Sequence, residues 1–164
     1  MKPLVGPVLG LLLAQVCYVR GVDVEQSPPA LSLQEEASST LWCNFSISTQ
    51  NVYWYRQKNG GRLDHLFSIP SGTKRNGRLN ATTVTTERRS SLYISSAQIT
   101  DSATYFCTVR GSGVGSSQLT FGKGTKLLVT PNIKNPDPAV YQLKGPKSNN
   151  ISVCLYTDFQ MNTT

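Results

Sequence analysis

Four residues, far apart along the chain, constrain the fold more than any other feature of the sequence. Cys43 and Cys107 are separated by 64 positions. Trp54 lies eleven residues after the first cysteine, and Tyr105 stands two before the second. This spacing predicts two facing β-sheets bridged by the cysteines, with Trp54 packed on the disulfide and the Tyr105 hydroxyl bonded to upstream backbone. Closing so long a loop stabilises a fold by about 4 kcal/mol. The alternative is two unrelated buried cysteines and a chance tryptophan.

Alternating apolar and polar residues predict an all-β domain from Val22 to Thr130, punctuated by Gly, Pro, Ser and Asn. No stretch in this range has sustained helical periodicity. Because side chains alternate between the two faces of a strand, inward-facing sets can be named for three runs. We expect these sets to form a core between two sheets. They are Leu41, Cys43 and Phe45; Leu92 and Ile94; and Ala103, Tyr105, Cys107 and Val109.

A second, incomplete unit is predicted for residues 131–164. The stretch PNIKNPDPAVYQL, at 131–143, begins with three prolines within eight residues, which argues against regular structure. Two strand-like runs, AVYQLKG and NISVCLYTDF, lie in the remainder. Two strands bury too little surface to be stable alone. We therefore expect a linker and the truncated start of a further domain.

The segment 1–21 predicts a secretory signal peptide, with Lys2 before a short apolar run and cleavage near Gly21. A transmembrane anchor is the alternative, but the run is interrupted by glycine and proline and is short for a bilayer. Three cysteines remain once Cys17 leaves with the leader, so Cys154 is expected to bridge another chain or a cysteine missing from this sequence. Four Asn-x-Ser/Thr sequons agree with the secretory route: Asn44, Asn80, Asn150 and Asn162.

Charge and motif content argue against nucleic-acid binding and against catalysis. The formal net charge of +7 falls to +5 without Lys2 and Arg20 of the leader, and the basic residues are not gathered among aromatics. His65 is the one histidine, and no HExxH, CxxC or G-x-S-x-G spacing occurs. The glycine-rich run at 111–117 matches neither common phosphate-binding motif. We expect no enzyme, no metal and no cofactor.

Several motifs resemble a known family. WYRQ at 54–57, DSATYFC at 101–107 and FGKGT at 121–125 are similar to variable domains of the immunoglobulin superfamily. NPDPAVYQL at 135–143 resembles the opening of a T-cell receptor alpha constant domain, and QLTFGKGTKLLVTP at 118–131 resembles an alpha joining segment. The variable-domain motifs alone would also suit an antibody light chain. The constant-region opening is what favours the T-cell receptor alpha chains.

The resemblance implies three antigen-contact loops at one end of the sandwich. The first two are expected at 47–51, between strands B and C, and at 69–73, between strands C′ and C″. The third is expected from Thr108 to Thr120, with Cys107 ending one strand and Phe121 beginning the next. Rigid ends and a glycine-rich middle are typical of a binding loop, although a hairpin without a ligand has the same composition. Arg110 is expected to contact peptide. The candidate contact residues are Ser48, Thr49, Gln50 and Asn51; Pro70, Ser71, Gly72 and Thr73; and Arg110, Gly111, Ser112, Gly113, Val114, Gly115 and Ser116.

An exposed aromatic patch is predicted on the face opposite the core. Because Trp54 points inward, alternation sends Tyr55 and Gln57 outward, and the same logic applies to Phe106. Together with Phe121 they form a surface that a soluble monomer rarely leaves bare, although single exposed aromatics are common. By resemblance the partner on this face is a T-cell receptor beta chain, with predicted contacts at Tyr55, Gln57, Phe106 and Phe121.

Arg78 and Asp101 are expected, by resemblance, to form an ion pair, which contributes at most about 1 kcal/mol if exposed. Trp42 also points outward by alternation, where a large indole has no evident use.

The resemblance as a whole implies an antigen-recognition subunit. Such a chain pairs with a beta chain, binds peptide presented by a major histocompatibility molecule, and lies on the extracellular side of the plasma membrane with signalling subunits. The alternative is another variable-type recognition or adhesion module, or an antibody light chain, that needs no beta chain. Co-expression with a beta chain discriminates between them.

Overall fold

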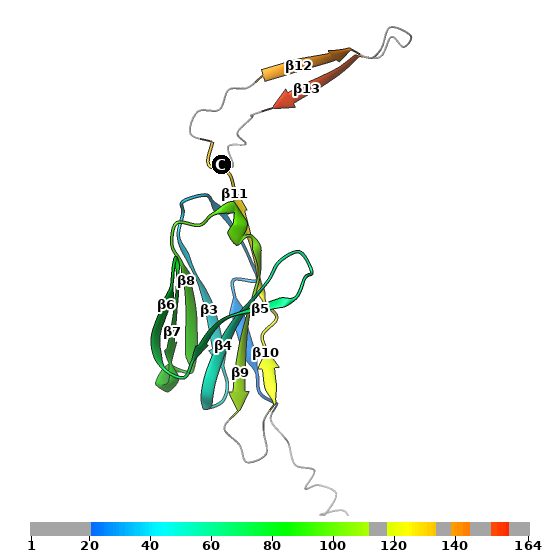
Figure 1. Cartoon of the computed structure of the whole chain (residues 1–164). Helices are drawn as coiled ribbons and strands as arrows, with labels where there is room; N and C mark the ends of the chain where they lie inside the picture. The colour runs from blue at the N-terminus through cyan, green and yellow to red at the C-terminus, as the bar shows by residue number, and fades with distance from the viewer. Residues whose placement is uncertain (1–20, 112–117, 134–138, 145–151, 158–164) are drawn as a thin grey trace, which may run out of the picture.

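The computed structural model describes residues 21–111, 118–133, 139–144 and 152–157 (Figure 1). Within them the regular structure is all strand apart from two short 3₁₀ helices, η1 and η2. The elements in chain order are β1 Val24–Ser27, β2 Ala30–Gln34, β3 Ser39–Phe45, β4 Thr49–Gln57, β5 Leu63–Ile69, β6 Gly72–Asn76, β7 Leu79–Val84, η1 Thr85–Glu87, β8 Arg89–Ile94, η2 Ile99–Asp101, β9 Ala103–Gly111, β10 Leu119–Phe121, β11 Thr125–Thr130, β12 Ala139–Lys144 and β13 Ser152–Thr157.

Eleven of these strands form two facing sheets. The five-stranded sheet has the order β1-β3-β8-β7-β6, and the six-stranded sheet has the order β2-β11-β9-β4-β5 with β10 also paired to β9 (Figure 1). Neighbouring strands run antiparallel, except that β2 pairs in parallel with β11, with Leu31 opposite Leu127. The predicted all-β, immunoglobulin-like sandwich is confirmed.

The strand β6 lies in the sheet opposite the strand that precedes it. It pairs with β7 over its whole length, from Gly72 opposite Thr83 to Asn76 opposite Leu79. Residues 70 and 71 therefore carry the chain from one sheet to the other. Gly72 has φ +76, a left-handed conformation that glycine adopts readily at such a crossing.

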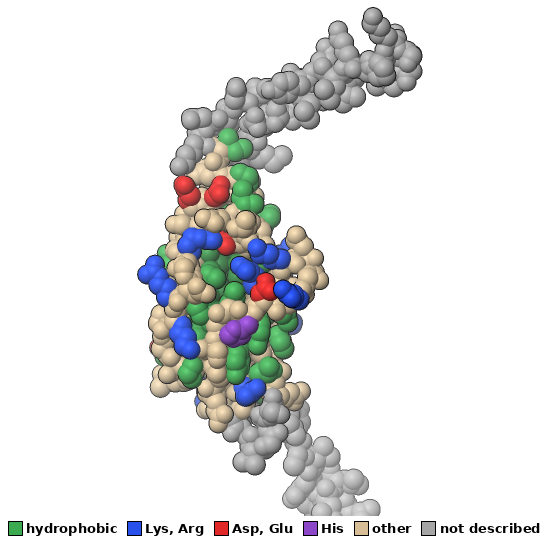
Figure 2. Space-filling model, in the orientation of Figure 1, with side chains coloured by type: hydrophobic (Ala, Val, Ile, Leu, Met, Phe, Trp, Pro, Cys, Tyr) green, Lys and Arg blue, Asp and Glu red, His purple; other side chains and the backbone are tan. Residues whose placement is uncertain are grey.

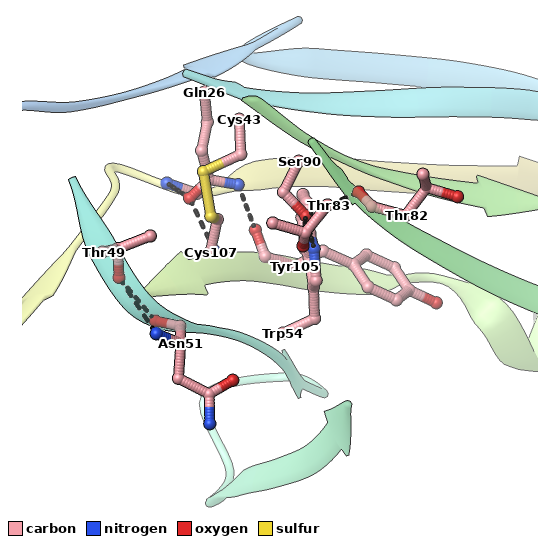
Figure 3. The surroundings of a disulfide bond; sticks show 11 residues. Gln26, Cys43, Thr49, Asn51, Trp54, Thr82, Thr83, Ser90, Tyr105 and Cys107 are labelled. Atoms are coloured by element: carbon pink, nitrogen blue, oxygen red, sulfur yellow. Dashed lines mark hydrogen bonds between the residues drawn. A yellow bond between two sulfur atoms is a disulfide. The ribbon is translucent and has the colours of Figure 1, made fainter. Parts of the chain in front are cut away.

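The core lies between the sheets and contains the inward-facing sets that alternation predicts, all of which are buried. The predicted disulfide between Cys43 and Cys107 is confirmed, and both residues are fully buried (Figure 3). Trp54 is the cross-strand neighbour of Cys107, and its indole nitrogen donates to Ser90 Oγ at 3.0 Å. A buried indole N–H thus has its partner, as burial requires.

The side chain of Gln26 joins β1 to the opposite sheet (Figure 3). Its Nε2 donates to the Tyr105 carbonyl at 3.1 Å, and its Oε1 accepts from the backbone N–H of Cys107 at 3.0 Å and of Gly124 at 3.1 Å. The close approach explains Gly122, because a Cβ there would overlap the Gln26 side chain. These bonds satisfy backbone groups where the last strand is divided into β10 and β11.

Strands β12 and β13 form an antiparallel pair of their own, with Gln142 opposite Cys154. The structure describes the backbone of this pair, so the partner of Cys154 lies outside what it shows. Of the expected leader at 1–21, all but Gly21 lies outside the described residues, as do Asn150 and Asn162. In the part of the chain that is described, no helix has the length and apolarity needed to cross a bilayer.

Candidate functional site

The first and third predicted loops meet at one end of the six-stranded sheet. Strand β4 pairs with β9 so that Thr49 lies opposite Gly111 and Asn51 opposite Arg110. The Thr49 hydroxyl lies 2.7 Å from the Arg110 carbonyl oxygen. Asn51 Nδ2 donates to Ser68 Oγ at 2.9 Å, which links the same end of the sheet to β5.

The second predicted loop reaches the same end. Ile69, Val52 and Val109 are opposite one another across β5, β4 and β9. Residues 70 and 71 follow directly, and they are exposed, as are Gly72 and Thr73. The register therefore brings parts of all three candidate loops together at one end of the six-stranded sheet.

The predicted loop boundaries are wrong in several places, because strands continue into them. Strand β9 does not end at Cys107 but runs to Gly111, and Thr108 and Val109 are completely buried. The backbone of β4 supplies pairing partners for this extension, which local glycine content cannot reveal. Residues 49–51 likewise open β4, residues 72 and 73 open β6, and β10 begins at Leu119. Of the third-loop candidates, Arg110 is exposed and Gly111 is buried, both within β9, and residues 112–116 lie outside the described part.

A patch of aromatic side chains covers the outer face of the six-stranded sheet. Tyr55 lies opposite Phe106, and its ring centroid is 6.0 Å from that of Phe121, which is 47% exposed. Tyr53 and His65 extend the patch, with ring centroids 6.4 Å and 5.4 Å from that of Tyr55. Figure 2 shows hydrophobic side chains beside the histidine, and basic side chains dispersed over this view.

Sequence reasoning placed fewer residues in this patch than the structure does. Leu63, opposite Gln57, is 43% exposed, and Leu128 on β11 is 53% exposed. Applying alternation to β11 would have identified Leu128, but in β5 it would have placed Leu63 inward with Phe67 and Ile69. Leu63 faces outward because the pairing of β4 with β5 shifts by one residue between Trp54 and Tyr55. Gln57 donates from Nε2 to the Gly61 carbonyl at 2.7 Å, so its amide already has an intrachain partner.

Gly124 lies close to the ring of Phe106, one of the residues of the aromatic patch. Its φ of +89 lies in the left-handed region, and a Cβ would come within 2.7 Å of the Phe106 ring. A larger residue at this position would displace Phe106, so the glycine fixes how this aromatic ring is presented.

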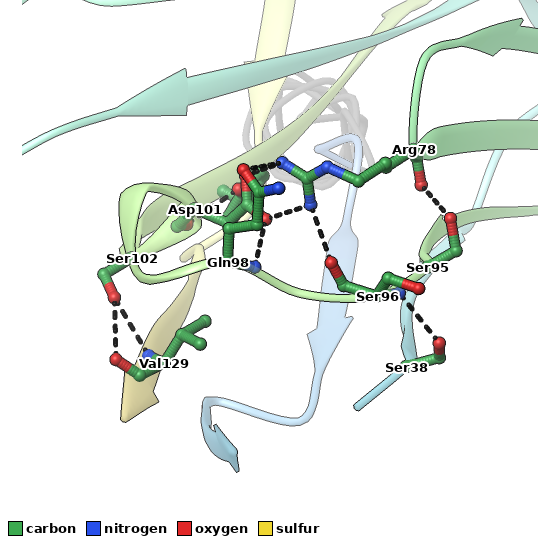
Figure 4. Close-up of polar contacts among 9 residues, drawn as sticks. Ser38, Arg78, Ser95, Ser96, Gln98, Asp101, Ser102 and Val129 are labelled. Carbon is green, nitrogen blue, oxygen red and sulfur yellow. Dashed lines mark hydrogen bonds and ion pairs between the residues drawn. The ribbon is translucent and has the colours of Figure 1, made fainter. Parts of the chain in front are cut away.

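The ion pair predicted between Arg78 and Asp101 is confirmed, but its carboxylate is buried rather than exposed (Figure 4). Arg78 makes two bonds to Asp101, of 2.5 and 3.0 Å. Asp101 Oδ2 also accepts from the Gln98 backbone N–H at 2.8 Å, which closes η2. The Asp101 carbonyl accepts the Tyr105 hydroxyl at 2.8 Å, as the predicted tyrosine bond requires. This cluster joins the turn before β7, where Arg78 lies, to η2 and β9.

The pKa values in this cluster follow from burial and pairing. Burial acts to raise the pKa of Asp101, but the bonds from Arg78 and the Gln98 N–H outweigh it, so the pKa lies below its ordinary value. Burial is the main reason that the pKa of Tyr105 rises to about 12, and the charge on Asp101 adds to it.

We expect acid to weaken the domain partly through Asp101. Because its folded-state pKa is lowered, its contribution is present above the ordinary value of 3.8 and is lost as the pH falls through the folded-state pKa. Unfolding in denaturant between pH 7 and pH 3 should show a steeper loss of stability for the native chain than for Asp101→Asn. Asp64→Asn is the control, because Asp64 makes only distant pairs at 3.9 Å with Arg56 and Arg62. Equal slopes for native chain and Asp101→Asn would contradict the assignment.

Two disulfide-bridged sheets, a buried tryptophan and the bond from Tyr105 to the Asp101 carbonyl define a variable-type immunoglobulin domain. Comparison with known proteins agrees. The profile of the immunoglobulin V-set domain matches residues 26–130. A second profile, described as a domain of unknown function, matches residues 138–164.

Curated relatives indicate which group of immunoglobulin variable domains this chain is similar to. Human T cell receptor alpha variable 22 is 65% identical over 109 residues, which cover 66% of this chain and 99% of that protein. Human T cell receptor alpha variable 17 is 39% identical over 109 residues, or 65% of this chain and 97% of that protein. The human T cell receptor alpha chain MC.7.G5 is 40% identical over 145 residues, or 85% of this chain and 52% of that protein. This chain therefore spans about half the length of that protein.

The chain belongs to the immunoglobulin V-set family and, within it, to the T-cell receptor alpha chains. Its relatives are receptors, and the chain is not an enzyme, as predicted. Among the described residues, no group of three or more His, Cys, Asp or Glu side chains is placed to hold a metal ion.

Proposed function

We propose that the chain is the antigen-recognition subunit of an alpha-beta T-cell receptor, which pairs with a beta chain and binds peptide presented by a major histocompatibility molecule. The observation that carries the proposal is that parts of the three loop segments lie at one end of the six-stranded sheet, directly beyond Ile69, Val52 and Val109. The aromatic patch on the same sheet supplies a face for the partner.

Recognition in this proposal involves no catalysis and depends on strands that hold the contact residues in fixed positions. Arg110 occupies an exposed position one residue before the end of β9, and its carbonyl accepts a hydrogen bond from the Thr49 hydroxyl at 2.7 Å. The guanidinium can therefore reach a ligand from a fixed backbone and form charge-assisted bonds with it. Ordering of the glycine-rich residues on binding offsets part of the interaction energy and keeps the affinity moderate.

The beta chain is proposed to pack on Tyr55, Phe106 and Phe121, with Gln57 at the margin. Packing there removes from water an aromatic surface that is partly exposed in the single chain. The Gln57 amide then either keeps its bond to Gly61 or exchanges it for one across the interface.

The remaining proposals concern the organisation of the whole chain and its location. Residues 1–21 are a signal peptide, residues 22–130 the variable domain, and residues 131–164 a linker with the start of a constant domain. The chain lies on the extracellular side of the plasma membrane and associates with signalling subunits of the receptor complex.

The test is assembly followed by binding. The chain is co-expressed with a T-cell receptor beta chain, and the purified heterodimer is screened against soluble peptide–histocompatibility complexes. A heterodimer that binds one of these complexes specifically supports the proposal. A chain recovered as a monomer that binds ligand without a beta chain would instead indicate an independent recognition module.

Arg110→Ala is expected to weaken binding of the identified complex about tenfold, because a hydrogen bond to a charged group is lost. Surface plasmon resonance on the heterodimer measures the change. Arg62→Ala is the matched control, because its side chain is 95% exposed and lies in the turn after Gln57, at the other end of β4. An Arg110 variant that binds as tightly as the Arg62 variant would remove Arg110 from the contact surface.

A further inference from the structure

Trp42 is an apolar side chain on a surface that the proposed function does not use. It lies on the outer face of β3, in the sheet opposite the aromatic patch, and 41% of its surface is exposed. The Arg89 guanidinium carbon lies 5.4 Å from its ring centroid, which covers part of the indole. The other tryptophan, Trp54, is completely buried.

The residue two positions further along the same strand is a sequon asparagine. Asn44 is exposed, and Ser46 completes Asn-Phe-Ser. Residues i and i+2 of a strand share one face and have Cα atoms roughly 7 Å apart. A sugar attached to Asn44 therefore begins beside the exposed part of the Trp42 indole.

We propose that Asn44 carries an N-linked glycan whose first N-acetylglucosamine packs against Trp42. The donor is an oligosaccharide linked to a lipid diphosphate. The Asn44 amide nitrogen forms a bond to C1 of its first sugar and loses a proton, while the bond from C1 to phosphate breaks and the lipid diphosphate leaves. The negative face of the indole attracts the C–H groups of the sugar ring and acetyl methyl. Because the sugar is tethered, this contact costs little of the entropy that free association costs.

The residues around Asn44 favour this position for the sugar. Asn44 lies opposite Glu25 on β1 and opposite Arg89 on β8, so polar and charged side chains flank it across the sheet. Along the strand, Trp42 is the neighbouring aromatic side chain. Arg89 can bond to the acetyl carbonyl while it remains near the indole. The inference gives Trp42 a role that alternation alone could not supply.

The second described sequon offers an internal comparison. Asn80 lies on β7 in the same sheet, opposite Tyr93 of β8 and Arg75 of β6. It is half-buried, and its Oδ1 is buried without a hydrogen-bond partner among the described residues. No aromatic residue lies two positions before or after it in its strand. A glycan on Asn80 is therefore expected to leave Trp42 uncovered.

The proposal requires passage through the secretory route but neither beta-chain pairing nor antigen binding. The whole chain is produced in mammalian cells, with a beta chain if it pairs, and mass spectrometry of its glycopeptides measures occupancy. Acrylamide quenching of tryptophan fluorescence then measures access to Trp42. Matching Trp42→Phe preparations identify the part of the signal that belongs to Trp42.

With the Asn44 glycan in place, or trimmed on the folded protein to one N-acetylglucosamine, quenching of Trp42 should be about half that in Asn44→Gln, because the sugar covers the exposed indole. Complete enzymatic removal from the folded protein should give the same increase and makes the test independent of whether Asn44→Gln folds. Asn80→Gln should leave quenching unchanged.

An unoccupied Asn44 would overturn the proposal. Equal quenching with and without the Asn44 sugar would overturn it too. If quenching of Trp42 increased as much in Asn80→Gln as in Asn44→Gln, the proposal would be overturned, because Trp42 would not be covered by the Asn44 glycan specifically. Loss of beta-chain pairing would contradict the proposed function but would leave this measurement intact.

Discussion

Replacing Cys43 and Cys107 together by alanine should lower the free energy of unfolding by about 4 kcal/mol, because the disulfide closes a long loop in the unfolded chain. Both residues are fully buried beside Trp54 in the middle of the core. A domain of this size has a total stability of about 5–15 kcal/mol, so this loss removes between about a quarter and most of it. Denaturant unfolding of the whole chain, followed by intrinsic fluorescence, measures the loss.

Cys154→Ala is the control for the disulfide variant. Cys154 belongs to the separate pair of β12 and β13, so its removal should leave unfolding of the sandwich unchanged. The variant that lacks both Cys43 and Cys107 would contradict the expectation if it unfolded at the same denaturant concentration as Cys154→Ala.

Changing Tyr55 and Phe106 together to serine should abolish pairing with a beta chain. Central aromatic residues of an interface each contribute about 2 kcal/mol or more, so loss of both predicts weakening of about a thousandfold. The two residues are opposite each other on β4 and β9, and Phe121 packs at 6.0 Å from Tyr55. Heterodimer yield and the dissociation constant, from size exclusion and sedimentation, measure the effect.

Tyr93→Ser is the control for the pairing variant, because Tyr93 is an aromatic residue on the other sheet and is 39% exposed. Pairing should survive this change. A normal heterodimer yield from the Tyr55 and Phe106 double variant, with circular dichroism showing an intact fold, would remove the beta chain from this face.

The core was predictable because it depends on local alternation and on a few strongly constrained residues. Leu41, Cys43 and Phe45 are buried on one face of β3, as a period of two requires. The disulfide, the Tyr105 bond and the Arg78–Asp101 pair also follow from motifs that can be read in the sequence. In these cases each local pattern agrees with the overall fold.

The ends of the loops were less predictable, because they depend on distant strands. Gly111 is a strand residue because Thr49 pairs with it, and Arg110 because Asn51 and Leu119 pair with it from either side. Gly and Ser suggest a loop wherever they occur, and tertiary pairing overrides that preference. The role of Gln26 is also invisible in the sequence, since its three partners are about 80 to 100 positions away.

The parallel pairing of β2 with β11 also bears on biosynthesis. Leu31 leaves the ribosome early, whereas Leu127, its partner, is translated near the end of the domain. Until then one border of the nascent sheet has unpaired amides and carbonyls, which invite association with other chains. A polypeptide that lacks β11 therefore cannot close this sheet, which makes it a natural substrate for chaperones and degradation.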